Sequence, residues 1–547
     1  MLQRLKLILI LLLMAVPSFI NSQSISKENI ENAEKLIDLN FTDAERDSMQ
    51  GYLEEQKGNY DKIRDVKLDN SVMPSLLFNP IPEGFVFPQT ADVKFSEYST
   101  TLMPANKNDL AFYTIGQLAE LVRTKQITSV QLTKFFIDRL KKYDTALHCV
   151  IRFTEERALR QAKIADEEIA AGKYRGLLHG IPFGVKDLLA TKDYKTTWGA
   201  MPYKDQIINE DAIVITKLEK AGAVLVAKLT MGALAWGDVW FGGTTRNPWD
   251  TTKGSSGSSA GSASSVSAGL LPFAIGTETY GSIVSPSTVC GTTGLRPTYG
   301  RVSRTGAMAL SWSMDKIGPI CRSAEDLAIV FNAIYGPDGI DQTIYNCGFN
   351  YQPSINLKDL KIGYLKKDFD KQYDFHKNDS LTLAKLKELG AELIPIDLPN
   401  YPVNDLAIIL SAEAGAAFDE LTRSNRDDLL VRQIKNAWPN SFRASRFIPA
   451  VEYINASRVR TLLIEETQKL MNKIDLYIAP TNEGDSNLLT NLTGQPCVVL
   501  PNGFSDNGTP TSITFIGKLF DEGRLIAFAK LYQDSTDFHK KHPAMFK

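Results

Sequence analysis

Histidine is scarce in this sequence of 547 residues, which has only five, far apart along the chain: His148, His179, His376, His539 and His542. There is no HExxH or CxxC motif and no cluster of Cys and His, so a zinc site built from a local motif is not expected. The few histidines also leave little material for a Ser-His-Asp triad. We predict no metal and no organic cofactor.

A surplus of charge is absent as well. Lys and Arg number 61 against 63 Asp and Glu, which gives a formal net charge of −2, and the pI is near 6.3. A broad basic surface is therefore not expected, and no nucleic-acid partner is predicted. Hydrophobic residues make up 43% and charged residues 23% of the chain. This composition excludes a largely disordered or fibrous protein.

The cysteines are few, odd in number and widely spaced, which argues against a disulfide framework. Four of them stand beside apolar residues or glycine. A free thiol in such surroundings behaves as a small buried hydrophobe. We expect the cysteines to be buried, at Cys149, Cys290, Cys321, Cys347 and Cys497.

The longest apolar run of the N-terminal region lies close to the start of the chain. Arg4 and Lys6 come before the ten-residue run Leu7–Val16, which is about half of the ~20 residues that a spanning helix needs. This layout is typical of a secretory signal peptide, predicted here over residues 1–22 with cleavage near Ser22. An uncleaved anchor is the alternative. We expect an exported protein, periplasmic or secreted, with no stable membrane insertion after cleavage.

An N-terminal extension is predicted over residues 23–105. Its first part is charged and helix-prone, and Thr42 with Glu45 forms a capping box that opens a helix through Tyr52. The Pro-rich stretch 73–87 suits an extended segment that wraps over another surface.

The rest of the chain alternates helical and strand patterns, which predicts an α/β layered core. Residues 115–144 have apolar positions at helical spacing. Further on, a helix is predicted to end at Lys220, with Gly222 as its stop and a short buried strand over 223–227. The region 357–471 is rich in charge and helical pattern.

Residues 253–297 begin with a run of Ser and Gly that has the composition of a flexible linker. Two features favour chemistry instead. The run passes directly into an apolar segment, and upstream an apolar stretch, GIPFGVKD, ends on Lys186. A strand that delivers a lysine at its end, and Gly-rich turns that deliver serines, can build a nucleophile and its base.

A serine hydroxyl needs a neighbouring base, and a lysine can serve only when it is neutral. Burial lowers the lysine pKa from about 10.4, and Lys186 lies in an apolar stretch. Asp187 would favour the charged form if it faced the same way. Gly281 lets the backbone before Ser282 approach a substrate, and successive N–H groups there can form an oxyanion hole.

Three motifs in this order, GIPFGVKD, GSSAGSASSVSAG and GTETYGSIVSPSTVCGTTGLRPT, resemble the amidase signature family. The resemblance continues through NPWD, MDKIGPICRSAEDLA, NLTGQPCVVLPNGF and FIGKLFDEGRL, and covers about 440 residues. It implies one large α/β/α domain with a mixed central sheet over residues 106–547. It also implies an amidase that hydrolyses a carboxamide C–N bond to a carboxylate and ammonia or an amine.

The resemblance implies a triad of Lys186, Ser258 and Ser282. Ser282 corresponds to the nucleophile, and Lys186 to the neutral base. Ser258 corresponds to the bridging serine, whose peptide bond with Gly257 is cis in the family. The resemblance further implies an oxyanion hole of the backbone N–H groups of Thr279, Tyr280, Gly281 and Ser282.

Substrate-binding positions implied by the resemblance are Thr230, Met231 and Gly257, although Met231 can equally be a core residue. We interpret His179 as a structural hydrogen-bonding residue rather than a base, and Asp338 as a turn residue.

In the third motif three positions depart from the family pattern: Glu278 replaces Asp, Tyr280 replaces Gly, and Val284 replaces Arg. In the Ser/Gly block, Ser256 and Ala260 each replace Gly. The resemblance implies that the Asp and Arg of the third motif form a pair in relatives, so we expect Val284 to leave Glu278 without that partner. Tyr280 would be strained if its φ were positive.

The predicted substrate is a small-molecule or peptide amide with an aryl, acyl or peptidyl acid, and the sequence leaves the oligomeric state open. One alternative is the glutaminase subunit of a tRNA-dependent amidotransferase, which works with partner subunits. The signal peptide and the extension argue against it. A second alternative is a non-catalytic binding protein on an amidase fold.

Overall fold

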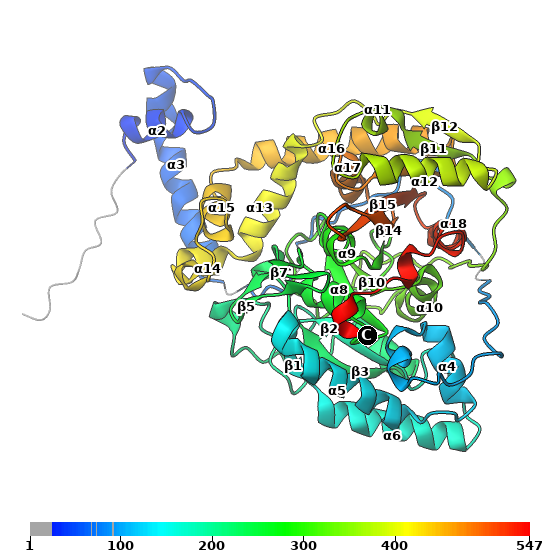
Figure 1. The fold of residues 1–547 in the computed structure, drawn as a ribbon. Helices are drawn as coiled ribbons and strands as arrows, with labels where there is room; N and C mark the ends of the chain where they lie inside the picture. Colours follow the sequence, from blue (N-terminus) through cyan, green and yellow to red (C-terminus); the bar gives the residue numbers. More distant parts are fainter. Residues whose placement is uncertain (1–24, 67, 73, 90–91) are drawn as a thin grey trace, which may run out of the picture. The chain divides into compact units, whose positions relative to one another are not determined.

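The computed structural model describes residues 25–547 apart from residues 67, 73 and 90–91 (Figure 1). The predicted signal peptide over residues 1–22 lies outside the described residues. The chain divides into two compact units, residues 1–69 and 70–547. The extension predicted over residues 23–105 thus includes part of both units.

The described residues of the first unit form the helices α2 (Lys27–Glu34) and α3 (Asp43–Arg64). The predicted capping box is confirmed: the Thr42 hydroxyl accepts from the Glu45 N–H, and the Glu45 carboxylate accepts from the Thr42 N–H at 2.6 Å. The helix ends at Arg64, later than predicted, because the residues after Tyr52 are mostly good helix formers. An ion pair of 2.8 Å between Arg46 and Glu34 joins the two helices.

The second unit is built on an eleven-stranded sheet with the order β1-β3-β2-β8-β10-β9-β14-β15-β13-β11-β12. Strands β2–β3, β2–β8, β11–β12 and β11–β13 pair in parallel and the others antiparallel, which confirms the predicted mixed sheet. The strands are β1 (Val150–Phe153), β2 (Pro182–Lys186), β3 (Val224–Leu229), β8 (Phe273–Glu278), β9 (Thr293–Arg296), β10 (Lys316–Cys321), β11 (Ile362–Leu365), β12 (Leu393–Ile396), β13 (Leu476–Pro480), β14 (Cys497–Phe504) and β15 (Pro510–Gly517).

Two small two-stranded sheets stand apart from the large one. They are formed by β4 (Val239–Trp240) with β5 (Gly243–Thr244), and by β6 (Arg246–Asn247) with β7 (Asp250–Gly254).

Helices cover the sheet of the second unit. In Figure 1, α5 and α6 lie together beside β3, and α8 packs against β8. The helices are α4 (Ile115–Arg123), α5 (Ser129–Leu147), α6 (Glu155–Ala170), α7 (Ile213–Lys220), α8 (Ala260–Ser267), α9 (Val284–Cys290), α10 (Ala324–Ile334), α11 (Lys366–Phe369), α12 (His376–Glu388), α13 (Ile408–Ala417), α14 (Asp419–Arg423), α15 (Trp438–Ser445), α16 (Ala450–Met471), α17 (Ser486–Thr493) and α18 (Glu522–Asp534).

Local signals of the sequence explain several boundaries. The pattern over residues 115–144 forms two helices, because Thr128 caps α5 and interrupts the run. As predicted, α7 ends at Lys220, Gly222 has a φ of +88°, and β3 follows. Residues 74–87, the described part of the Pro-rich stretch, form no helix or strand, and Phe85 and Phe87 pack on the Phe520 ring, as expected for a wrapping segment.

The middle of the sheet is the core of this unit. Every residue of β2, β3, β8 and β10 is buried, which is typical of strands covered on both faces. All five cysteines are buried, as predicted. Among these apolar strands, β2 and β3 each bury a lysine, Lys186 and Lys228. Because a buried lysine is costly without partners, the surroundings of each need an explanation.

Candidate active site

Lys186 is the last residue of β2 and is fully buried. Its Nζ donates to the Ser258 Oγ at 2.7 Å, the Thr277 Oγ1 at 2.8 Å and the Ser259 Oγ at 3.2 Å. These hydroxyls come from the end of β8 and from the turn before α8, which the sheet brings to the same edge as the end of β2. The structure therefore places the predicted base and bridging serine in direct contact.

Burial lowers the pKa of Lys186 to about 7, although the carboxylates of Asp315 and Glu278 act in the opposite direction. The hydroxyls around Nζ carry no formal charge, so they do not hold the ammonium form as a carboxylate would. A lysine with a pKa near 7 has a substantial neutral fraction at neutral pH and can accept a proton.

Asp187 does not face the site of Lys186. It is fully buried, accepts from the Thr197 N–H at 2.8 Å and forms an ion pair of 3.1 Å with Lys228. Because successive residues of a strand point to opposite faces, the aspartate next to the lysine is directed away from it. The condition under which Asp187 would favour the charged lysine is thus not met.

The turn that carries Ser258 is tightly constrained. The peptide bond between Gly257 and Ser258 is cis, as the resemblance implies. A Cβ at Gly257 would lie 1.8 Å from the carbonyl oxygen of Gly237, so only glycine fits there. The Ser259 N–H donates to the Ser282 carbonyl at 3.1 Å and thereby joins this turn to the segment of the predicted nucleophile.

Ser282 lies between β8 and α9 and is 8% exposed. The residue before it, Gly281, has a φ of +82°, and Tyr280 has no positive φ. The strain considered for Tyr280 is therefore absent, and its side chain is 45% exposed. In the described residues, the N–H groups of Tyr280, Gly281 and Ser282 have no acceptor, which leaves them available to an oxyanion.

Glu278 lacks a partner at position 284, but it has another ionic partner, which was not predicted. Its carboxylate is 2.9 Å from Arg296 on β9, and it accepts from the N–H groups of Ile283 and Val284 at 2.8 and 3.0 Å. Burial alone would raise the pKa of Glu278, but Arg296 and the hydrogen bonds outweigh it and lower the pKa to about 2. The charged carboxylate thus holds the turn that presents Ser282.

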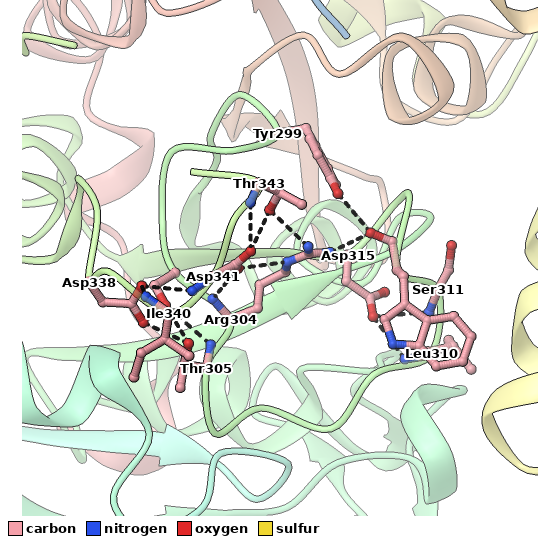
Figure 2. Close-up of polar contacts among 12 residues, drawn as sticks. Tyr299, Arg304, Thr305, Leu310, Ser311, Asp315, Asp338, Ile340, Asp341 and Thr343 are labelled. Atoms are coloured by element: carbon pink, nitrogen blue, oxygen red, sulfur yellow. Dashed lines mark hydrogen bonds and ion pairs between the residues drawn. The ribbon is translucent and has the colours of Figure 1, made fainter. Parts of the chain in front are cut away.

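A cavity of about 330 Å³ adjoins these groups. Thr277 and Thr279 line it from one side, and the loop that precedes β10 lines it from another. Figure 2 shows the polar contacts of this loop, in which Arg304 runs between Asp341 and the backbone before Asp315. The cavity therefore adjoins Thr277, which accepts from Lys186, and one of its walls is held by its own hydrogen bonds.

Of the predicted site residues, only Thr279 lines this cavity; the side chains of Lys186, Ser258 and Ser282 do not. Thr230 and Met231 are fully buried and do not line it. The Thr230 hydroxyl bonds to that of Thr245 at 2.7 Å and donates to the His148 carbonyl at 3.2 Å. Met231 packs in the main hydrophobic core. Their role in substrate binding stays a prediction.

The two residues interpreted as structural have that role. His179 is buried, its Nδ1 accepts from the Arg175 N–H, and its Nε2 is 3.1 Å from the Glu168 carboxylate. Burial lowers its pKa, and it precedes β2, whereas Lys186 ends that strand. Asp338 accepts from the N–H groups of Ile340 and Asp341, both at 2.9 Å, as a turn residue does.

Sequence reasoning missed Thr277, Ser259 and Arg296. All three stand in the motifs that carry the resemblance, but a motif does not show which contacts its residues make, because each acts through a partner on another element.

In the part of the chain that the structure describes, no cluster of three or more His, Cys, Asp or Glu side chains is placed to hold a metal ion. None of the helices within the described ranges combines the length and the hydropathy that a bilayer-spanning segment requires.

A buried lysine of lowered pKa beside a serine, with unused backbone N–H groups next to a second serine, is an arrangement suited to acyl transfer. Comparison with known proteins agrees. The model of the family described as Amidase matches residues 131–487. A glutamyl-tRNA(Gln) amidotransferase subunit of Coxiella burnetii is 34% identical over 480 residues, covering 79% of this chain and 99% of that protein.

Solved structures give the same result. The peptide amidase of Stenotrophomonas maltophilia has a TM-score of 0.69 at 27% identity, covering 78% of this chain and 98% of that one. A bacterial aryl acylamidase of the amidase signature enzymes has a TM-score of 0.70 at 22% identity and the same coverage, and shares the fold. The chain belongs to the amidase family, and it is a hydrolase that acts on amide bonds.

Proposed function

We propose that this amidase cleaves a carboxamide through an acyl-enzyme on Ser282, with Ser258 and Lys186 as its proton relay. The observation that carries the proposal is the 2.7 Å hydrogen bond between the Lys186 Nζ and the Ser258 Oγ, made by a lysine whose pKa burial lowers to about 7. A neutral lysine can accept the proton that passes through Ser258.

In the acylation step, the Ser282 Oγ attacks the amide carbonyl carbon and loses its proton to Ser258, whose own proton passes to Lys186. The carbonyl oxygen becomes an oxyanion, which the N–H groups of Thr279, Tyr280, Gly281 and Ser282 stabilise. The C–N bond then breaks as the relay returns the proton to the leaving nitrogen, so ammonia or an amine departs.

Deacylation uses the same groups in reverse. A water molecule attacks the ester on Ser282 and loses a proton to the relay, and the Ser282 Oγ takes a proton back as the ester bond breaks. The products are a carboxylate and the free enzyme.

The test is release of ammonia or amine from a panel of amides, with Ser282→Ala and Ser258→Ala beside the unsubstituted protein. We expect Ser282→Ala to lower kcat/KM about 10⁴-fold or more, since it removes the nucleophile. Ser265→Ala is the matched control, because Ser265 is a buried serine of α8 that bonds only within its helix. Full turnover by Ser282→Ala would overturn the proposal.

The second candidate is glutamine hydrolysis within an amidotransferase, which the similarity to subunits of glutamyl-tRNA(Gln) amidotransferases favours. It predicts turnover of glutamine that rises when partner subunits are added. Absence of fluorophosphonate labelling at Ser282 together with inactivity on every amide would favour the non-catalytic alternative.

For location, the proposal remains export through a signal peptide over residues 1–22, supported by Arg4, Lys6 and the apolar run Leu7–Val16. N-terminal sequencing of the mature protein tests it: a start near Gln23 supports cleavage, and a start at Met1 contradicts it.

A further inference from the structure

The cavity adjoins the proposed catalytic groups. Thr277 lines it, and the hydroxyl of Thr277 accepts from the Lys186 Nζ at 2.8 Å. Thr279, whose N–H belongs to the proposed oxyanion hole, lines it too, as does Leu188, which follows Lys186 closely in the chain. Ser282 itself does not line the cavity, which meets the proposed catalytic groups through Thr277 and Thr279.

The cations in the wall are already engaged. Arg304 forms an ion pair of 3.3 Å with Asp341 and donates to the Trp312 carbonyl at 2.6 Å and the Thr343 hydroxyl at 2.9 Å (Figure 2). Lys316 donates to the Met314 carbonyl, and burial lowers its pKa well below the usual value. Neither side chain offers the wall an uncompensated positive charge.

Carboxylates outnumber cations in the lining. The lining contains three acidic residues, Glu210, Asp315 and Asp341, and two basic residues, Arg304 and Lys316. Asp315 accepts from the Thr279 hydroxyl and from the N–H groups of Leu310 and Ser311 at 2.8 and 3.0 Å. A substrate carboxylate would thus enter a site that already has more negative than positive groups, at a cost in Coulomb energy and desolvation.

The remaining wall is mostly apolar. Leu188, Met308, Leu310 and Ile317 are buried, and Trp312 and Ile340 also line the cavity. Polar groups are added by Asn70, Ser71 and Thr305. The volume of about 330 Å³ lies at the small end of the usual range of ligand pockets, about 300–1,000 Å³. A site of this size and lining favours a short uncharged chain or a single ring.

We propose that this cavity binds the acyl side of the substrate, and that the substrate is a primary or simple carboxamide with an uncharged, apolar acyl group. The inference rests on the proposed function. It separates this chain from a glutaminase, because free glutamine would bring an α-carboxylate and an α-ammonium group into a wall whose cations and buried carboxylates are already paired.

The test compares ammonia release from acetamide, butyramide, hexanamide and phenylacetamide with release from glutaramate and glutamine. We expect kcat/KM to rise about fourfold for each methylene that the cavity buries. For glutaramate and glutamine, we expect kcat/KM at least about 100-fold below that of hexanamide, because each carries a carboxylate.

A variant of Ala307 tests whether the acyl group binds in this cavity. Ala307→Phe narrows it, since Ala307 lines it, and we expect the ratio of kcat/KM for hexanamide over acetamide to fall at least about tenfold. Ala171→Phe is the matched control, because Ala171 is exposed after α6 and outside the lining, and it should leave the ratio unchanged. Fluorophosphonate labelling of Ser282 in each variant reports whether the site is folded.

The other outcomes distinguish failure of this inference from failure of the proposed function. A flat series from acetamide to hexanamide, or a preference for glutamine or glutaramate, overturns the inference and leaves the amide hydrolysis by Ser282 standing. An unchanged ratio in a labelled Ala307→Phe protein overturns the placement in this cavity. Inactivity on every amide without labelling removes the proposed function itself.

Discussion

Lys186 on β2 and Lys228 on β3 are both fully buried, and burial lowers the pKa of each. The surroundings of the two ammonium groups differ. Lys186 meets hydroxyls, whereas Lys228 forms a 3.1 Å ion pair with Asp187 and donates to the Leu189 carbonyl and the Thr196 hydroxyl at 3.0 and 2.6 Å. Burial alone therefore does not make a lysine a base; the charge of its partners decides.

The register of the two strands separates these surroundings. Lys186 is paired with Leu229, and Lys228 with Val185. Since paired residues point to the same face and successive ones to opposite faces, Lys228 and Asp187 share the face that Lys186 avoids. A one-residue shift of register would move the Lys228 side chain to the face of Lys186 and away from Asp187, and would break the ion pair.

The largest effect on activity is expected from replacing Lys186, the lysine whose Nζ is surrounded by hydroxyls. Lys186→Met should lower kcat/KM about 10⁴-fold, because it removes the base of the relay. It should leave the free energy of unfolding equal or higher, since a buried ammonium without an ionic partner is replaced by an apolar chain. Activity assays and urea unfolding measure the two quantities. A large loss of stability would contradict the assignment of Lys186 as a mainly functional residue.

The opposite pattern is expected at Lys228. Lys228→Met leaves Asp187 buried without its cation, which should cost about 3–5 kcal/mol of unfolding free energy. The double variant Lys228→Met/Asp187→Asn should regain most of that loss in urea unfolding. Lys220→Met, at an exposed lysine at the end of α7, serves as the control and should change little. A mild effect of Lys228→Met would mean that the ion pair does not hold this part of the sheet.

The sequence predicted Lys186 as a site residue but did not predict the ion pair of Lys228. Lys186, Ser258 and Ser282 stand in recognisable motifs, and the α/β pattern predicted the layered core. The partners of Lys228 and Glu278 could not be predicted, because they depend on strand order and register. Arg296 on β9 reaches Glu278 on β8 only because both strands flank β10. The valine at position 284, where relatives have arginine, does not indicate this other partner.

The pH dependence of activity and stability should further distinguish the protonation behaviour of Lys186 from that of Lys228. Because the pKa of Lys186 is about 7, kcat/KM should rise about tenfold per pH unit below that value and level off above it.

For stability the sign follows from proton counts. Between pH 7 and 10.5, the unfolded Lys186 holds a proton that the folded one lacks, so the unfolding free energy gains about 1.4 kcal/mol per pH unit from this group. Lys186→Met should lose that contribution, measured as the difference between urea unfolding of the two proteins across the window. Parallel curves for both would show that Lys186 stays charged in the folded protein.

The smallest effect concerns single hydroxyls, one beside each lysine. Thr277→Val removes an acceptor at 2.8 Å from the Lys186 Nζ and keeps the shape of the side chain. Because that hydroxyl favours the ammonium form, its loss should lower the pKa of Lys186 and move the acid limb of kcat/KM down by up to about one pH unit. Thr196→Val removes the corresponding acceptor of Lys228, at 2.6 Å, and should leave the limb in place. If both variants moved the limb equally, the two lysines would be coupled through the sheet, and their separation by strand register would fail.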